Sequence, residues 1–136
     1  LRTFRRNNFF AACACGDLDI LREMIQRPEI NFNSIDHYHR TGFIIACHYG
    51  QVETVEFILK NAKLKDIDLN WQADNELTGF HIACIRGHYK IVSLIMNHAS
   101  ELCIDLFQKD SEGQTAFEMW PEIFTETYTE IHLKQF

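Results

Sequence analysis

The sequence predicts an all-α solenoid, in which copies of one helical unit stack along the chain. The main observation is a set of positions that return every 37 residues, and three threonines mark it, at 41, 78 and 115. Isoleucine returns with the same spacing at 30, 67 and 104, and phenylalanine at 43, 80 and 117. A fixed period of this length is typical of repeat proteins, in which each unit covers the apolar face of its neighbour.

Each unit is predicted to begin with a short helix. Phe43, Ala46 and Cys47 lie at positions i, i+3 and i+4, which share one face of a helix. The same triplet occurs at 9, 12 and 13 and at 80, 83 and 84, and its small alanine predicts the close approach of a neighbouring helix. A glycine follows each triplet and is predicted to end the helix in a left-handed conformation, at Gly16, Gly50 and Gly87.

A second helix is predicted after each glycine. Its apolar stripe has helical spacing and consists of Leu18, Leu21 and Ile25 in the first copy, Val52, Val55, Ile58 and Leu59 in the second, and Ile91, Val92, Ile95 and Met96 in the third. Short alternating runs then follow at 30–33, 67–70 and 104–107. They predict extended arms and turns that lead into the next threonine.

A helix, tight turn, helix and extended finger that repeat in this way resemble the ankyrin repeat. The family's Thr-Pro-Leu-His element corresponds here to 41–44, 78–81 and 115–118, with glycine or alanine in place of proline. Its Gly-His pair is whole only at 87–88, and its Asp-x-x-Gly-x-Thr turn only at 110–115. Because His39 and Glu76 replace the glycine of that turn, the two earlier finger tips are expected to be distorted. The resemblance implies helix-turn-helix units with β-hairpin finger loops.

The resemblance covers about residues 7–120 and implies about three full repeats with a degenerate fourth. We expect one domain over 1–136, with repeats at about 5–35, 36–72 and 73–109, a degenerate repeat or cap at 110–120, and a tail or capping element at 121–136. The family period is about 33 residues, so insertions are expected between Leu59 and Ile67 and between Met96 and Ile104. Trp120 and Pro121 should end the regular stack, and the tail is expected to form a helix, with a strand as the alternative.

Composition narrows the function classes. The chain carries a net charge of −6, which disfavours a nucleic-acid partner, and contains no apolar run long enough for membrane insertion. Its five cysteines are an odd number, which favours an intracellular location, cytoplasmic or nuclear. Cys13, Cys47 and Cys84 recur at one repeat position and are expected to be buried apolar filler. Because the chain begins with Leu1, it is expected to be a segment of a longer protein.

Histidines and cysteines suggest two alternative hypotheses, a metal site and a catalytic site. His37 and His39, on a presumed extended arm near His48, suggest a zinc site, and Cys47 with His48, or Cys84 with His81 or His88, suggest a nucleophile and base. The zinc site is disfavoured because the spacing fixes no further ligand. The catalytic pair is disfavoured because the cysteines are expected to be buried. The resemblance makes His81 a hydrogen-bonding tie between turns, and places Asn33 and Asn70 where ankyrin domains can be hydroxylated. No catalytic residue, cofactor or metal is expected.

The resemblance implies a protein-protein interaction module, monomeric in isolation, that binds a protein or peptide through its concave face. The first-helix residues expected on this face include Ala14 and Cys15. The hot spots are expected to be Tyr38 in a finger and Tyr49 and Arg86 on the helices. The partner-binding residues are expected to be His37, Tyr38, Arg40, His48, Tyr49, Asn75, Leu77, Ile85, Arg86, Ser111, Glu112 and Gln114. The alternatives are a regulatory or tethering domain that acts within a larger enzyme or channel, and a hydrolytic or metal site.

Overall fold

The computed structural model describes residues 6–119, and this part of the chain is helical. It contains seven α-helices and one short 3-10 turn: α1 (Arg6–Cys15), α2 (Leu18–Met24), α3 (Gly42–His48), α4 (Val52–Asn61), η1 (Asp74–Glu76), α5 (Gly79–Arg86), α6 (Tyr89–Leu102) and α7 (Ala116–Met119). The all-α prediction is therefore confirmed for these residues. Trp120, Pro121 and the tail prediction lie outside them.

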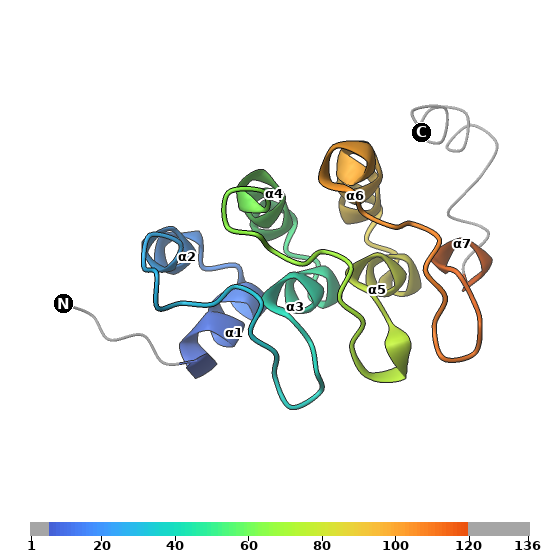
Figure 1. The fold of residues 1–136 in the computed structure, drawn as a ribbon, viewed down its shortest axis with the longest axis horizontal. Helices are drawn as coiled ribbons and strands as arrows, with labels where there is room; N and C mark the ends of the chain where they lie inside the picture. The colour runs from blue at the N-terminus through green and yellow to red at the C-terminus, as the bar shows by residue number, and fades with distance from the viewer. Residues whose placement is uncertain (1–5, 120–136) are drawn as a thin grey trace.

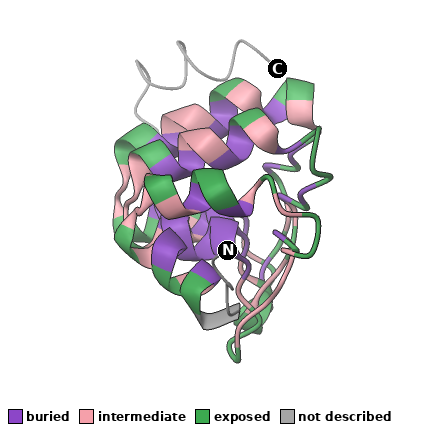
Figure 2. Ribbon diagram, turned by 90° about the vertical axis from the view of Figure 1, so that its left-hand side faces the viewer, coloured by how far each residue is buried: buried purple, intermediate pink, exposed green. Residues whose placement is uncertain are grey.

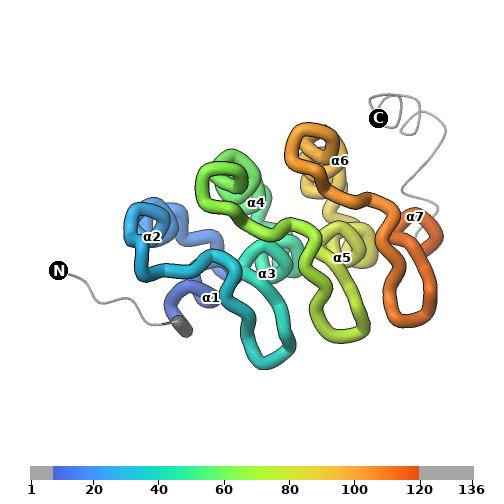
Figure 3. The backbone as a smooth tube through the Cα atoms, in the orientation of Figure 1, coloured from blue at the N-terminus to red at the C-terminus, as the bar shows by residue number. Residues whose placement is uncertain are grey.

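The helices lie in two rows. Figure 1 shows α1, α3, α5 and α7 in one row and α2, α4 and α6 in the other. In the first row α3 packs between α1 and α5, and α5 packs against α7; in the second row α4 packs against α6. Long loops join each second-row helix to the next first-row helix, and they project away from the second row (Figure 3).

The core runs through the interior of both rows. The predicted triplets are all buried, and Ala46, Ala83, Cys47 and Cys84 are fully inaccessible. Figure 2 shows the buried residues lining the inward sides of the helices. Apolar burial contributes roughly 25 cal/mol per Å², so this continuous core is the main source of stability. The predicted apolar stripes of the second helices also face inward, with Ile58, Leu59, Ile91 and Ile95 among the buried residues.

Threonine caps the first-row helices α3 and α5. The Oγ1 atoms of Thr41 and Thr78 accept the N–H groups of Ile44 and His81, which satisfies a free donor of the first turn. In α5 the cap is reciprocal, because Nδ1 of His81 accepts the N–H of Thr78. The opposite nitrogen, Nε2, donates to the carbonyl of Gln114, 3.1 Å away on the following loop. His81 is fully buried, so the predicted hydrogen-bonding tie between turns is confirmed.

Glycine follows the capping threonine because a phenylalanine occupies the space of a side chain. A Cβ atom on Gly42 would lie 2.6 Å from Cζ of Phe9, and one on Gly79 would lie 2.6 Å from Cε2 of Phe43. Contacts between carbon atoms this short do not occur without a shift of one partner. Glycine at these positions therefore reflects close packing between successive first-row helices.

The loops correct one prediction. Within residues 6–119 the finger β-hairpins are absent, and the extended pairing is reduced to an isolated bridge between Ile35 and Thr41. The Asp36 carboxylate accepts the N–H groups of Tyr38 and Arg40 and so closes the turn between the two residues of this bridge. The Asp110 carboxylate accepts those of residues 112 and 114 in the same way. Short side-chain turns at residues 31, 68 and 105 also interrupt the alternating runs.

Replacement of the turn glycine changes the backbone less than expected. His39 and Glu76 have φ values of 59° and 58°, in the same left-handed region as Gly113 at 77°. The first tip therefore keeps the glycine conformation. The expected distortion occurs only in the second loop, where Asn75 also has a positive φ of 62°. Alanine stands at position 73 of this loop, where the other two loops have aspartate, so no carboxylate holds the turn.

The second-row helices lengthen along the chain. They contain 7, 10 and 14 residues in α2, α4 and α6; the insertion expected after Met96 extends α6 to Leu102, whereas most of the one expected after Leu59 follows the end of α4 at Asn61. The glycines at 16, 50 and 87 have φ values of 76°, 71° and 72°, which confirms the predicted left-handed ends. None of the helices in 6–119 combines the length and the hydropathy that a bilayer-spanning segment needs.

Candidate protein-binding surface

A hollow lies where the first long loop meets the first-row helices. It is a cavity of about 300 Å³, lined by Phe10, Ala11 and Ala14 of α1, Asp36, His37 and Arg40 of the loop, and Ile45 and Tyr49 of α3. We call the surface formed by the loop tips and the exposed sides of α1, α3 and α5 the inner face. The cavity is the hollowed part of this face, and four of its lining residues were predicted from sequence as inner-face residues: Ala14, His37, Arg40 and Tyr49.

The predicted partner-binding residues are all accessible. Tyr38 and Tyr49 are each about half exposed, at 52% and 53%, and Ile85 is 45% exposed. His37, Arg86, Asn75, Ser111, Glu112 and Cys15 are also exposed. Arg40, His48, Leu77, Gln114 and Ala14 are partly buried. Large exposed aromatic side chains are frequent anchors of protein interfaces, so their clustering marks this face as a binding candidate.

A hydrogen-bonded turn holds the loop residues in place. The Asp36 carboxylate accepts Nε of Arg40 at 2.9 Å as well as the two backbone N–H groups of the turn. The Arg40 guanidinium lies 5.1 Å from the centre of the Tyr38 ring, a cation–π distance. Burial raises the pKa of Asp36. The hydrogen bonds from Arg40 and Tyr38 and the charge of Arg40 lower this pKa by a larger amount in total, so the net shift is downward. Asp36 is therefore ionised at neutral pH.

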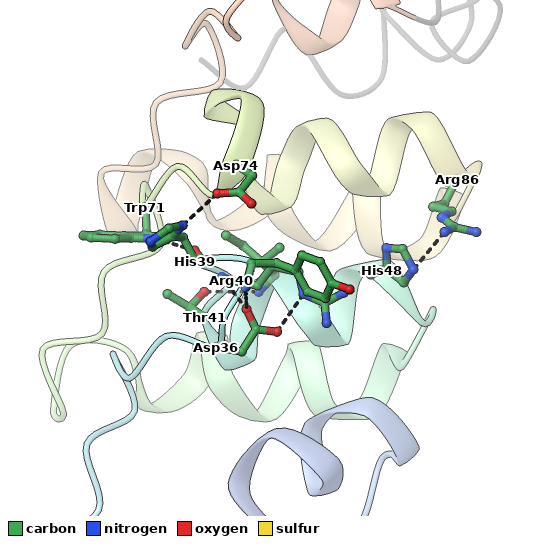
Figure 4. Close-up of polar contacts among 10 residues, drawn as sticks. Asp36, His39, Arg40, Thr41, His48, Trp71, Asp74 and Arg86 are labelled. Atoms are coloured by element: carbon green, nitrogen blue, oxygen red, sulfur yellow. Dashed lines mark hydrogen bonds and ion pairs between the residues drawn. The ribbon is translucent and has the colours of Figure 1, made fainter. Parts of the chain in front are cut away.

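A second contact joins α3 to α5 on the same face. Nη2 of Arg86 donates to Nε2 of His48, 2.8 Å away, and Figure 4 shows the two side chains meeting. Burial lowers the pKa of His48, and the charges of Arg86, Arg40 and His88 lower it further. A neutral imidazole keeps Nε2 free to accept this hydrogen bond. The His48 ring also contacts the Tyr49 ring at 4.7 Å, which continues the surface to the cavity.

The tip of the first loop is tied to the second loop. Nδ1 of His39 lies 2.7 Å from a carboxylate oxygen of Asp74, and Nε1 of Trp71 donates to the carbonyl of His39 (Figure 4). The backbone N–H of Asp74 also donates to the carbonyl of Tyr38. These contacts hold His39 in its left-handed conformation. Sequence reasoning did not identify Asp74, because contacts between loops depend on how the units stack and leave no local motif.

The predicted residues farther along the chain extend the face but do not line the cavity. The carbonyl of Asn75 accepts the N–H of Ser111, which repeats the link between the first two loops 37 positions later. Gln114 and Glu112 donate their N–H groups to Asp110. Leu77 is partly buried and closes the second turn through its carbonyl. These residues position the loops side by side, whereas the aromatic and arginine side chains gather near α1, α3 and α5.

The constellations suggested for metal binding do not assemble. The prediction of an extended His-x-His arm is wrong, because residues 36–40 form a tight turn. The ring of His37 contacts that of Tyr38 at 4.1 Å, whereas His39 points to Asp74. Among the described residues no three His, Cys, Asp or Glu side chains come together in an arrangement that could hold a metal ion.

The repeated cysteines are poor nucleophiles. Cys13, Cys47 and Cys84 are buried, as predicted, and carry free thiols. Burial raises the pKa of the Cys13 thiol to about 12, with a smaller contribution from Cys15, and raises that of Cys84 to about 12. Burial also raises the pKa of Cys47 above its usual value, with a smaller contribution from Cys84. These thiols remain protonated at neutral pH, which opposes the hydrolytic alternative, since the thiolate is the nucleophile.

Asn33 and Asn70 have matching structural roles. The amide nitrogen of Asn33 donates to the carbonyl of Asp66, and its oxygen accepts the N–H of Asp68. Asn70 makes the equivalent pair of hydrogen bonds with residues 103 and 105. Each asparagine therefore links its own loop to the exit of the next second-row helix. The prediction that either one is hydroxylated stays a prediction.

Comparisons with known proteins add no assignment: no family model matches the chain, and neither does any curated protein.

Proposed function

We propose that this chain is an ankyrin-repeat solenoid domain that binds a partner protein or peptide through its inner face and has no catalysis of its own. The observation that carries the proposal is the exposure of Tyr38, Tyr49 and Arg86 on the inner face, beside a cavity that Tyr49 and the partly buried Arg40 line. Interface hot spots are enriched in tyrosine, tryptophan and arginine. The same domain is proposed to work inside the cell.

The repeat assignment is supported by contacts that recur with the sequence spacing. Phe9 fills the space beside Gly42, and Phe43 does so beside Gly79. The asparagine links from 33 to 66 and from 70 to 103 are separated by 37 residues, and so are the loop contacts 74 to 38 and 111 to 75. Equivalent contacts between successive units are what a solenoid requires, because each unit buries the face of its neighbour.

Binding is supported by the rigidity of the surface. Arg40 is held by Asp36, Arg86 is held by His48, and the tip that carries Tyr38 is tied to the next loop at Asp74. Side chains already fixed in one conformation lose little entropy when a partner arrives, and each immobilised side chain otherwise costs roughly 0.5–1.5 kcal/mol. A preformed face of this kind favours recognition over the protonated, buried thiols as the source of function.

The proposal is tested by placing a photocrosslinking amino acid at Tyr49 and, as the matched control, at Glu53, an exposed residue of α4 in the second row. Irradiation in lysate of the source organism, followed by mass spectrometry, should give a protein adduct from position 49 only. A domain with Tyr38→Ala, Tyr49→Ala and Arg86→Glu, shown by its melting curve to be folded, should no longer compete for that protein. Adducts from Glu53 alone would move the binding surface to the second row, and a crosslink within a longer parent chain would favour the intramolecular regulatory role.

A further inference from the structure

Two arginines of the inner face act on His48. The chain has a net charge of −6 and the loop tips carry Asp74, Glu76 and Glu112, but His48 feels the positive charges of Arg86 on α5 and Arg40 on the first loop. We propose that the inner face recognises an acidic peptide segment of the partner, with a carboxylate bound at Arg86 and Arg40 and a neighbouring apolar side chain in the cavity. This inference rests on the proposed function and specifies the chemistry of the partner.

Arg86 is available for a carboxylate. Within residues 6–119 it makes a hydrogen bond to the neutral His48 ring and no ion pair to a carboxylate within 4.0 Å. One nitrogen of the guanidinium is therefore used for orientation, and the residue is exposed. A guanidinium held in this way is suited to the paired hydrogen bonds that carboxylates make with arginine.

Arg40 has a similar free side. Asp36 takes its Nε atom, and the Tyr38 ring covers one face of the guanidinium at 5.1 Å. Asp36 neutralises one charge, but its oxygens already accept three N–H groups and are mostly buried, with the side chain 8% exposed. The carboxylate of Asp74 is engaged by His39 on the far side of the loop tip. Arg40 lines the cavity together with Asp36, whose carboxylate is already engaged by these three N–H groups.

The lowered pKa of His48 reports the same local potential. After burial, the causes of the shift are the positive charges of Arg86 and Arg40 and the neighbouring His88, all of which disfavour a second cation. A site that repels a proton on its own histidine attracts a negative charge brought by a ligand. Charge pairs across an interface select the partner and speed association more than they add affinity.

The cavity gives the segment its apolar requirement. Phe10, Ala11, Ala14 and Ile45 line its floor, and Tyr49 forms the wall that continues to His48. Its volume of about 300 Å³ accommodates a side chain but not a folded element. An extended peptide with an acidic residue beside a leucine or aromatic residue satisfies both parts of the surface. A wholly polar acidic chain would leave the cavity unfilled.

The test is a selection of short random peptides displayed on phage against the immobilised domain. The same selection is made with Arg86→Gln and with the matched control Arg22→Gln, which removes an exposed arginine paired with Asp19 on α2. Wild type and Arg22→Gln should enrich peptides that pair Asp or Glu with an apolar residue, and Arg86→Gln should not. In fluorescence anisotropy, a selected synthetic peptide should lose about tenfold or more in affinity when its acidic residues become Gln, since the hydrogen bonds between two charged groups are lost.

The outcomes separate this inference from the proposed function. Selected peptides that lose affinity for the Tyr49→Ala variant but show no preference for acidic residues would support binding at the inner face. They would overturn its specificity for acidic segments. Equal acidic enrichment by wild type and Arg86→Gln would place the carboxylate elsewhere and also overturn the inference. If no peptide is enriched while the Tyr49 crosslink still yields a protein, a linear acidic segment is wrong and the partner presents a folded surface. If both experiments fail, the proposed function fails with it.

Discussion

The packing at Gly79 makes a sharp prediction about stability. A Cβ atom at this position would lie 2.6 Å from Cε2 and 2.9 Å from Cδ2 of Phe43, and 3.2 Å from Sγ of Cys47. Phe43 is 2% exposed and Cys47 is fully buried, so neither can move into solvent. We therefore expect Gly79→Ala to destabilise the domain, although alanine normally favours a helix over glycine.

The expected magnitude follows from two opposing effects. Overpacking a buried site costs about 1–3 kcal/mol, and the reduced freedom of the unfolded chain returns about 0.4–1 kcal/mol. The net loss in the free energy of unfolding is therefore about 0.5–2 kcal/mol, a fall of several degrees in Tm. Helix α7 supplies a matched control, because Ala116 stands at the position equivalent to Gly79 and is fully buried. Ala116→Gly should also destabilise the domain. Opposite substitutions at equivalent positions should therefore both lower the free energy of unfolding.

The assay is urea unfolding followed by circular dichroism, with the variant and wild type at equal m-values. Phe43→Leu replaces the ring that meets the new methyl group by a smaller side chain. The loss in the free energy of unfolding of the double variant with Gly79→Ala should therefore be smaller than the sum of the two single losses. A coupling of about 0.5 kcal/mol or more is expected for residues in contact. A Gly79→Ala protein as stable as wild type, or more stable, would refute the steric reasoning and the helix register.

Three further outcomes are expected. His81→Leu removes the buried tie from α5 to Gln114 and should lower the free energy of unfolding by about 1–3 kcal/mol in urea, whereas an unchanged midpoint would deny the tie any role in stability. Asp36 has a lowered pKa in the fold, so its contribution is present at neutral pH and is lost as the pH falls below about 4; the stability gap between wild type and Asp36→Asn should therefore close in acid. Ala46→Trp and Ala83→Trp overpack fully buried sites and should abolish the cooperative melting transition, and a wild-type melt from either would show that the stack is wrongly aligned.

Local patterns predicted most of the helices. Threonine at a helix start, glycine at its end and an apolar triplet at i, i+3 and i+4 are signals contained in a few neighbouring residues, and Thr78, Gly87 and Phe80 behave as those signals indicate. The glycine after Thr78 carries a further signal, because its missing side chain leaves room for a residue of the preceding unit. A phenylalanine 36 residues earlier, Phe43, was the clue that the two positions touch.

Contacts between units were less predictable from sequence. The Arg86 to His48 hydrogen bond joins residues 38 positions apart, and its formation depends on side-chain rotamers as well as on the stack. The β-hairpin fingers were predicted by resemblance, but within residues 6–119 the structure has only the isolated bridge between Ile35 and Thr41 in their place. Exposure of Tyr38 and Tyr49 followed correctly from the repeat register, whereas the cavity beside Tyr49 became visible only in three dimensions.

The row of buried cysteines gives this molecule a built-in reporter of local opening. Cys13, Cys47 and Cys84 place one protected thiol in each of three successive first-row helices, and the two exposed cysteines, Cys15 and Cys103, can be changed to serine without entering the core. A thiol reagent then modifies each remaining site only when its own part of the stack opens. The order of modification, read by mass spectrometry, ranks the units by their local free energy of opening without any added probe.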